Sequence, residues 1–296
     1  MFSIVIPLFN KEYSIIRSLD SIYNQTFKNY EVIIIDDGST DNSKKIVEGY
    51  IENKCNFKIS SQNNSGVSEA RNKGVKRSSY EFVCFLDADD EWEPNFLESM
   101  KKLIDTYGEA SLFCVQHKMI SIDDNKVEIN KSSYPNNYMG YVDDFFKRSL
   151  KGSIANSSKV CIRKEKFIKL GGFPVGEKSG EDLFLWIKFA LNYPVAFYNI
   201  PLVNVYFVPD YSRVGRNISI PYPFLYYSDS VERNKMTFWL KMYLRKIIIS
   251  HLFLSFKESN LTSFKARRSS IRNVFPMLYF SLGLPLLTLK VREYVK

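Results

Sequence analysis

Short apolar runs alternate with helix-like segments along the first 116 residues of this 296-residue chain. The runs are rich in β-branched and aromatic side chains, which predicts strands at residues 2–8, 30–35, 57–60, 80–86 and 112–116. Between the runs, apolar residues recur every three or four positions, as in amphipathic helices. The alternation predicts an α/β fold with a mostly parallel central sheet and helices on both faces. Ligands of such sheets bind at the carboxyl ends of the strands.

For several of these predicted helices, the sequence also indicates the N-cap residue or the buried face. The helix predicted over residues 12–23 has an apolar stripe at threefold spacing, formed by Tyr13, Ile16, Leu19 and Ile22. Thr40 or Asp41 is expected to cap the helix that ends near residue 51, and Ser68 the helix that follows the third strand.

Three segments with possible binding residues lie at the carboxyl ends of predicted strands, at residues 7–10, 36–39 and 87–90. Each segment alone is typical of a turn or a solvated loop, but their succession at strand ends points to one site. The chain has no GxGxxG after a strand and no GxxxxGK[ST], so a glycine-rich phosphate loop is excluded. The carboxylates of Asp87 and Asp89 are instead suited to a divalent cation that carries a phosphorylated ligand.

The net charge of +9 is confined to the end of the chain. Residues 231–296 carry 13 Lys and Arg against 3 Asp and Glu, whereas residues 1–230 carry 28 against 29. The cations of the tail lie beside long aliphatic runs and not among spaced aromatic platforms, which argues against nucleic-acid binding. We therefore predict one domain over residues 1–230, followed by a helical basic region at 231–296.

Cysteine and histidine usage favours a cytosolic protein without a zinc site. The four cysteines lie far apart with no CxxC spacing, and we expect all four to be reduced core residues. His117 and His251 are expected to be structural. Residues 1–8 are apolar without a basic segment before them, which predicts a first strand and not a signal peptide.

In order and spacing, five segments of the chain resemble the family 2 inverting glycosyltransferases with the GT-A fold. The segments are residues 3–10, 25–27, 31–41, 66–74 and 85–90. The resemblance resumes at Lys169-Leu170-Gly171-Gly172-Phe173 and at residues 180–186. It implies transfer of a hexose or N-acetylhexosamine from a nucleotide diphosphate sugar to a glycan hydroxyl. It also implies that residues 1–230 are the catalytic domain, with a donor half at about 1–115 and an acceptor half at about 116–230.

The resemblance also assigns roles to residues. Asp87 and Asp89 resemble the DxD motif, which holds Mg²⁺ or Mn²⁺ against the donor diphosphate, while Asp90 and Glu91 are expected to face solvent. Asp37 resembles the carboxylate that reads the imide edge of uracil, which favours UDP, although dTDP has a similar edge. The remaining donor-binding candidates are Pro7, Phe9, Glu12, Asp36, Ser39, Arg71 and Ala88. For Arg71, a plain surface arginine is the alternative.

The general base is expected at the start of the helix that follows Gly180. Asp182 is favoured and Glu181 is the next candidate, since two neighbours differ by roughly 100° around a helix and only one can face the anomeric carbon. Many relatives place a metal-binding histidine in the segment that corresponds here to residues 206–213, which contains none. Asp210 could substitute, the metal could take only the DxD carboxylates with phosphates and water, or the segment could be misaligned.

The basic region at 231–296 has two interpretations. Its uncharged run at 274–289 is shorter than the roughly 20 residues that span a bilayer, so we expect a segment that lies in the membrane interface. The alternative is a helical subdomain packed on the catalytic domain or on a second subunit, which leaves a homo-oligomer open. With the family, this predicts a peripheral enzyme at the inner face of the cell membrane that extends a polyprenyl-diphosphate-linked glycan in bacterial surface polysaccharide synthesis. An inactive sugar-nucleotide-binding homologue or scaffold is the alternative function.

Overall fold

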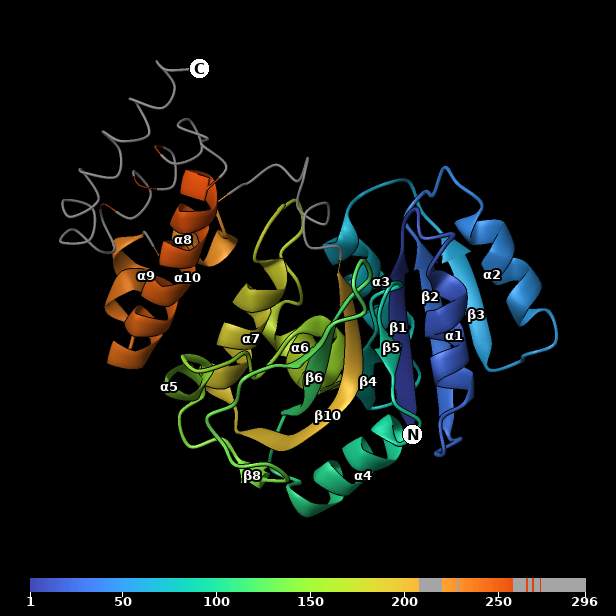
Figure 1. Cartoon of the computed structure of the whole chain (residues 1–296), viewed down its shortest axis with the longest axis horizontal. Coiled ribbons are helices and arrows are strands. Elements are labelled where there is room, and N and C mark those ends of the chain that lie inside the picture. The colour runs from blue at the N-terminus through green and yellow to red at the C-terminus, as the bar shows by residue number, and fades with distance from the viewer. Residues whose placement is uncertain (208–219, 228, 258–264, 266–267, 269–271, 273–296) are drawn as a thin grey trace. The chain divides into compact units, whose positions relative to one another are not determined.

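The computed structural model describes residues 1–207, 220–227 and 229–257, together with residues 265, 268 and 272 (Figure 1). They form two compact units. The first comprises Met1–Gly176 with residues 182–207 and contains the sheet. The second comprises Glu177–Glu181 with the described residues after 219, and it contains the last three helices.

The first unit is built on a ten-stranded sheet in the order β3-β2-β1-β4-β9-β6-β10-β5, with β7 paired to β6 and β8 to β10. The strands are β1 (Phe2–Leu8), β2 (Tyr30–Asp36), β3 (Phe57–Ser61), β4 (Phe82–Phe85), β5 (Glu91–Trp92), β6 (Leu112–Ser121), β7 (Val127–Ile129), β8 (Met139–Tyr141), β9 (Val160–Arg163) and β10 (Val195–Phe207). The pairs among β3, β2, β1 and β4 are parallel, as is the pair of β6 with β10, whereas β9 runs antiparallel between β4 and β6. The predicted mostly parallel sheet is confirmed.

Ten α-helices accompany the sheet among the described residues. They are α1 (Ile15–Tyr23), α2 (Ser43–Ile51), α3 (Val67–Arg77), α4 (Phe96–Thr106), α5 (Phe145–Ser149), α6 (Lys164–Leu170), α7 (Glu181–Asn192), α8 (Tyr222–Tyr226), α9 (Ser230–Asn234) and α10 (Phe238–Lys257). A short 3-10 helix, Ser157–Lys159, precedes β9. Across the described part of the chain, no helix combines the length and apolar character that a membrane span requires.

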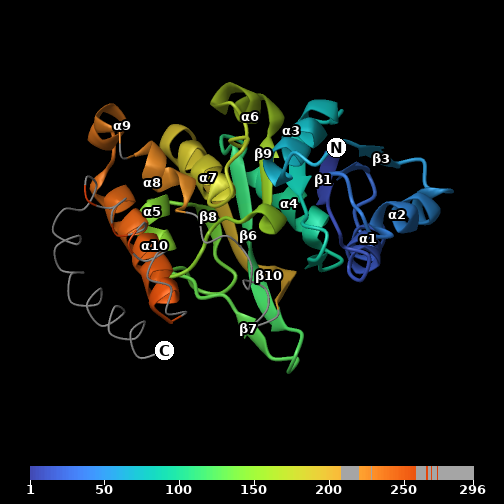
Figure 2. The same ribbon diagram turned by 90° about the horizontal axis from the view of Figure 1, so that it is seen from above.

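Helices cover both faces of the sheet, as predicted. On one face, alternate residues of β1 and β2 share a core with the apolar sides of α1, α2 and α4. On the other, Ile33 and Ile35 pack with Ala70 of α3, and Phe85 of β4 contacts Trp186 of α7 with ring centroids 6.3 Å apart. Figure 2 shows α3, α6 and α7 together on this second face. The carboxyl ends of β1, β2 and β4 therefore lie at an edge of the sheet, between its two helix-covered faces.

The predicted buried face of the first helix was wrong in part. Tyr13 is 96% exposed and Ile16 39% exposed, whereas Ile15 is fully buried beside Leu19 and Ile22. The helix begins at Ile15, and the side that faces the sheet follows spacings of four and three from that residue, not threefold spacing from Tyr13.

Two further expectations are corrected by the structure. Ser68 is the second residue of α3 and does not cap it, because the N-cap is Gly66 at φ 91°. That conformation lies in the left-handed region, where glycine has no steric cost. Cys55 is exposed and so is not a core residue, whereas Cys84, Cys114 and Cys161 are free and buried, as predicted.

Gly74 brings α3 into direct contact with β1, and its replacement by alanine should destabilise the fold. A Cβ at this position would overlap Val5 Cγ1 and lie 3.0 Å from Cγ2, and Val5 is fully buried. We expect Gly74→Ala to lower the free energy of unfolding by about 2 kcal/mol, because overpacking outweighs the gain in helix propensity. Urea unfolding followed by circular dichroism measures this change.

Gly49→Ala is the matched control, since Gly49 lies in the exposed face of α2 and an added Cβ would have no other atom within 4 Å. This variant should gain roughly 0.5–1 kcal/mol from helix propensity alone. Equal stability of the two variants would show that α3 does not pack on β1 as described.

Candidate active site

The loops that follow β1 and β2 are joined by hydrogen bonds at the carboxyl edge of the sheet. The Asp37 backbone N–H donates to the Leu8 carbonyl over 2.8 Å. Asn10, at φ 51°, donates its backbone N–H to Ser39 Oγ over 3.1 Å, and its side-chain oxygen accepts from the Thr40 N–H over 2.8 Å. The first two strand-end segments predicted from the sequence therefore form one connected surface.

Asp36 and Asp37 are both buried within this surface. The Asp36 carboxylate accepts from the Ser39 N–H over 3.0 Å. The Asp37 carboxylate accepts three hydrogen bonds, from Gln62 Nε2 and the Ser65 N–H at 2.8 Å and from the Gly66 N–H at 2.9 Å. Asp37 thus holds the loop that leads into α3, and its use in reading a base stays a prediction.

The other nucleoside-site candidates lie around the same edge. Pro7 is the penultimate residue of β1, opposite Ile35 of β2. Phe9 is 41% exposed just beyond the strand. Glu12 accepts from the backbone N–H and the side-chain amide of Asn42, each at 3.0 Å, which ties the start of α1 to the start of α2.

Asp87 and Asp89 follow β4, and each carboxylate is paired with a cation. Arg71 Nη2 lies 2.6 Å from Asp87 Oδ1, and Lys11 Nζ lies 2.5 Å from Asp89 Oδ2. The two acidic side chains remain 36% and 37% exposed. They therefore combine charge, proximity to cations and access to solvent, which is what a site for a charged ligand requires.

The backbone of this acidic segment is held by the first helix. Ser14 Oγ donates to the Ala88 carbonyl over 2.9 Å, Arg17 Nη2 to the Asp89 carbonyl over 2.7 Å and Ser18 Oγ to the Asp90 carbonyl over 2.6 Å. Three successive carbonyls are thus bound by one turn of α1 and the residue before it. These contacts fix the direction in which the carboxylates point.

Asp90 is buried, so the expectation that it faces solvent was wrong. Ser158 Oγ donates to Asp90 Oδ2 over 2.5 Å and accepts from the Asp87 N–H over 3.2 Å. Burial raises the pKa of Asp90 well above its ordinary value, and the charge of Asp87 raises it further. Asp90 therefore connects the acidic segment to Ser158 in the interior of the fold. Glu91 is partly exposed, and its carboxylate accepts a hydrogen bond from the Tyr206 hydroxyl over 2.6 Å.

Arg71 links the acidic segment to the predicted base. Its side chain is only 5% exposed, which excludes the surface-arginine alternative. Asp182 is the second residue of α7. Burial raises the pKa of its carboxyl group above the ordinary value, the positive charge of Arg71 lowers that pKa in part, and the negative charge of Asp87 raises it. The guanidinium carbon of Arg71 lies 5.2 Å from the centre of the Phe173 ring, and that ring lies 5.7 Å from the ring of Trp186, one turn after Asp182 in α7. The helix that carries Asp182 therefore packs close to Arg71. Glu181 is the first residue of α7.

The donor set at Asp87 and Asp89 fits a divalent cation. Two partly exposed carboxylates on one strand end are hard oxygen ligands, and phosphates and water usually complete such a coordination shell. Within the described residues, no group of three His, Cys, Asp or Glu side chains surrounds a common point. Asp210, one of the alternatives for a further ligand, lies outside the described residues.

The described contacts of His117 are those of a buried residue of the sheet. His117 is buried in β6 with its Nδ1 3.2 Å from the Nζ of buried Lys159, and burial lowers its pKa to about 2. His251 lies within α10. The structural role predicted for His117 agrees with this burial.

Lys11 and Ser158 were missed in the sequence. Lys11 follows Asn10 directly, and this position beside a strand-end segment is a weak signal that it could be a site residue. Ser158 has no such signal, because it reaches Asp87 and Asp90 across 68 to 71 residues of chain. Only the tertiary structure brings it there.

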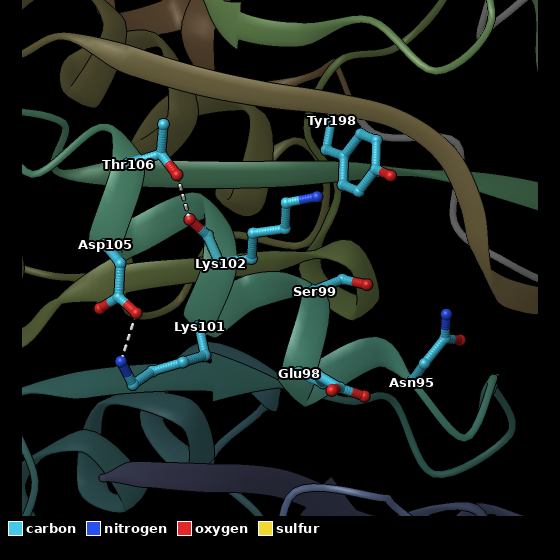
Figure 3. Close-up of a pocket in the computed structure, with 8 residues that line it drawn as sticks. All are labelled: Asn95, Glu98, Ser99, Lys101, Lys102, Asp105, Thr106 and Tyr198. Carbon is cyan, nitrogen blue, oxygen red and sulfur yellow. Dashed lines mark hydrogen bonds and ion pairs between the residues drawn. The ribbon is translucent and has the colours of Figure 1, made fainter.

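Neither Asp87 nor Asp89 lines either of two surface hollows, although Arg17, which binds the Asp89 carbonyl, lines the second. One, of about 450 Å³, is lined by α4 and Tyr198 and contains none of the predicted site residues (Figure 3). The other, of about 500 Å³, lies between α1 and β5, where Tyr13 is part of its wall. The polar edge described above, and not either hollow, gathers the candidate catalytic groups.

Comparison with known families identifies the class of protein. The sequence profile of the family described as Glycosyl transferase family 2 matches residues 3–171. The chain therefore belongs to glycosyl transferase family 2, and the resemblance found in the motifs is confirmed.

Two curated relatives match about a third of the chain at more than 40% identity. The putative glycosyltransferase EpsH of Bacillus subtilis is 41% identical over 98 residues, which cover 33% of this chain and 28% of EpsH. The amylovoran biosynthesis glycosyltransferase AmsB of Erwinia amylovora is 43% identical over 108 residues, or 35% of this chain and 36% of AmsB. The chain thus spans about a third of the length of these relatives.

Solved structures support the fold. The crystal structure of S. aureus TarS residues 1–349 in complex with UDP-GlcNAc matches with a TM-score of 0.72 at 22% identity, covering 92% of this chain and 81% of that one. The structure of GalNAc-T7 with UDP, GalNAc and Mn²⁺ matches with a TM-score of 0.58 at 19% identity, covering 77% and 47%. The predicted GT-A fold is confirmed.

Proposed function

We propose that the protein is a metal-dependent, inverting glycosyltransferase. It transfers a hexose or N-acetylhexosamine from a nucleotide diphosphate sugar, most simply a UDP-sugar, to a hydroxyl group of a glycan acceptor. The observation that carries the proposal is the pair of carboxylates Asp87 and Asp89 at the carboxyl edge of a GT-A sheet, each beside a cation. The helix that carries Asp182 packs close to one of these cations, Arg71.

The acidic segment and its basic neighbours suit the leaving group of this reaction. As the glycosidic bond breaks, negative charge develops on the β-phosphate of the nucleoside diphosphate. Asp87 and Asp89 would hold a divalent cation, which would supply Lewis-acid stabilisation of that charge. Arg71, whose guanidinium is buried and fixed by Asp87, is placed to add a positive charge beside the same phosphate.

The acceptor half of the reaction requires a base. A sugar hydroxyl is too weakly acidic to attack unaided, and a carboxylate that takes its proton during attack accelerates the step. Asp182 is our candidate, because a raised pKa makes its carboxylate a better proton acceptor than an ordinary aspartate, with Glu181 as the alternative. A single displacement by the hydroxyl inverts the anomeric centre.

The names of the relatives support a role in bacterial surface polysaccharide synthesis. AmsB acts in amylovoran biosynthesis, and GgaA of Bacillus subtilis, 42% identical over 106 residues, in minor teichoic acid biosynthesis. We extend this to an acceptor carried on a polyprenyl diphosphate and to a peripheral position at the inner face of the membrane. Most of the basic region that would contact the lipid lies outside the described residues.

A panel of nucleotide sugars tests the proposal. Purified full-length protein with Mn²⁺ should release nucleoside diphosphate from one or two donors, with UDP-sugars preferred. Binding of a nucleotide sugar without release or transfer to any glycan acceptor would instead support an inactive scaffold. Addition of EDTA should abolish the release, and restored Mn²⁺ should return it.

A further inference from the structure

Lys11 is held in a position from which its side chain reaches Asp89. Its backbone N–H donates to Ser43 Oγ over 2.6 Å, and its carbonyl accepts from the N–H groups of Ser14 and Ile15 over 3.1 and 3.0 Å. The ammonium lies 2.5 Å from Asp89 Oδ2, across 78 residues of chain. Both ends of this contact are therefore fixed by the fold and not by chain proximity.

The two cations of the acidic segment differ in their freedom. The Arg71 side chain is 5% exposed, whereas that of Lys11 is 36% exposed. A lysine ammonium on a flexible stem changes partner easily, and a buried guanidinium does not. A divalent cation bound to Asp89 would meet the Lys11 ammonium at close range, where like charges repel. Metal binding to Asp89 thus requires Lys11 to leave.

We propose that Lys11 is a built-in counter-ion that couples metal binding at Asp89 to binding of the nucleoside diphosphate, an inference that rests on the proposed function. Without nucleotide, the ammonium neutralises Asp89 and competes with the divalent cation. When a diphosphate arrives with the cation, its oxygens accept the displaced ammonium. Lys11 therefore makes the site bind metal weakly alone and strongly with the donor, which keeps the carboxylates from capturing free cations.

Mn²⁺ binding to the full chain, measured by the electron paramagnetic resonance signal of free Mn²⁺ with and without UDP, tests this coupling. Without UDP, Lys11→Met should bind Mn²⁺ about fivefold more tightly than the wild type, because an exposed ion pair contributes roughly that much. The tightening caused by UDP should shrink by a similar factor. Lys11→Arg keeps the positive charge and should remain within about twofold of the wild type.

Lys101→Met provides the matched control. Lys101 is 37% exposed and paired with Asp105 on α4, so its replacement removes the same charge from an equally exposed lysine (Figure 3). Its Mn²⁺ binding should equal that of the wild type, and an affinity gain as large as that of Lys11→Met would overturn the proposal by assigning the effect to net charge.

The variant Asp89→Asn distinguishes a failure of the role proposed for Lys11 from a failure of the proposed metal site. Loss of Mn²⁺ binding in Asp89→Asn together with unchanged binding in Lys11→Met would reject the role of Lys11 and leave the DxD assignment intact. Unchanged Mn²⁺ binding in Asp89→Asn would reject the metal site itself. Circular dichroism of each variant confirms that the compared chains are folded.

Discussion

Asp89→Asn should reduce sugar transfer by about 10³-fold, which corresponds to roughly 4 kcal/mol of lost transition-state stabilisation. The substitution keeps the size of the side chain but removes its charge, so a divalent cation loses a ligand and the leaving diphosphate loses its charge stabilisation. The backbone of Asp89 is held independently through its carbonyl by Arg17. The loss should therefore fall on catalysis and not on folding, and it is measured as nucleoside diphosphate released per unit time.

Asp105→Asn on α4 is the control for this variant, since Asp105 is paired with a lysine as Asp89 is but lies outside the candidate site. It should retain wild-type activity. Higher Mn²⁺ concentrations should recover part of the rate of Asp89→Asn if the defect is weaker metal binding. An Asp89→Asn enzyme with activity within fivefold of the wild type would remove the DxD motif from the mechanism.

The sequence predicts those site residues that lie at the ends of strands. Asp36 is the last residue of β2 and Asp37 follows it, while Asp87 and Asp89 come shortly after the end of β4. Parallel strands bring their carboxyl ends to one edge. The alternation of apolar runs locates those ends, because burial on both faces gives the strands an uninterrupted apolar sequence. The sheet and its polar edge were therefore predictable.

The contacts that aim the carboxylates were not predictable in the same way. Lys11 meets Asp89 across 78 residues, and Ser158 meets Asp90 across 68. Such pairs depend on how α1 and the 3-10 helix before β9 pack, which no local pattern records. The solvent position expected for Asp90 failed for this reason: a charged residue after a strand is usually solvated, but here Ser158 and Ser18 take it into the interior.

Asp182→Asn should lower the turnover number by about 10³-fold, because a positioned carboxylate base contributes roughly 10²- to 10⁴-fold to proton transfer. Metal binding at Asp87 and Asp89 should be nearly unaffected, so the loss appears in the turnover number and not in the Mn²⁺ requirement. Glu181→Gln is the matched control on the preceding residue of α7. If Glu181 is the base, Glu181→Gln will instead show the large loss of turnover and Asp182→Asn will not.

The pH dependence of the rate identifies Asp182 independently. A base acts only when ionised, so activity is lost as pH falls through its pKa. Burial raises the pKa of Asp182 above its ordinary value, with Arg71 opposing and Asp87 adding to the rise. The acid limb of the wild-type profile should therefore lie at higher pH than an ordinary aspartate would give. Asp182→Asn has no carboxylate to protonate, so its residual rate should lack this limb while Glu181→Gln keeps it. A limb that persists unchanged in Asp182→Asn would assign the titration to another group and remove Asp182 as the base.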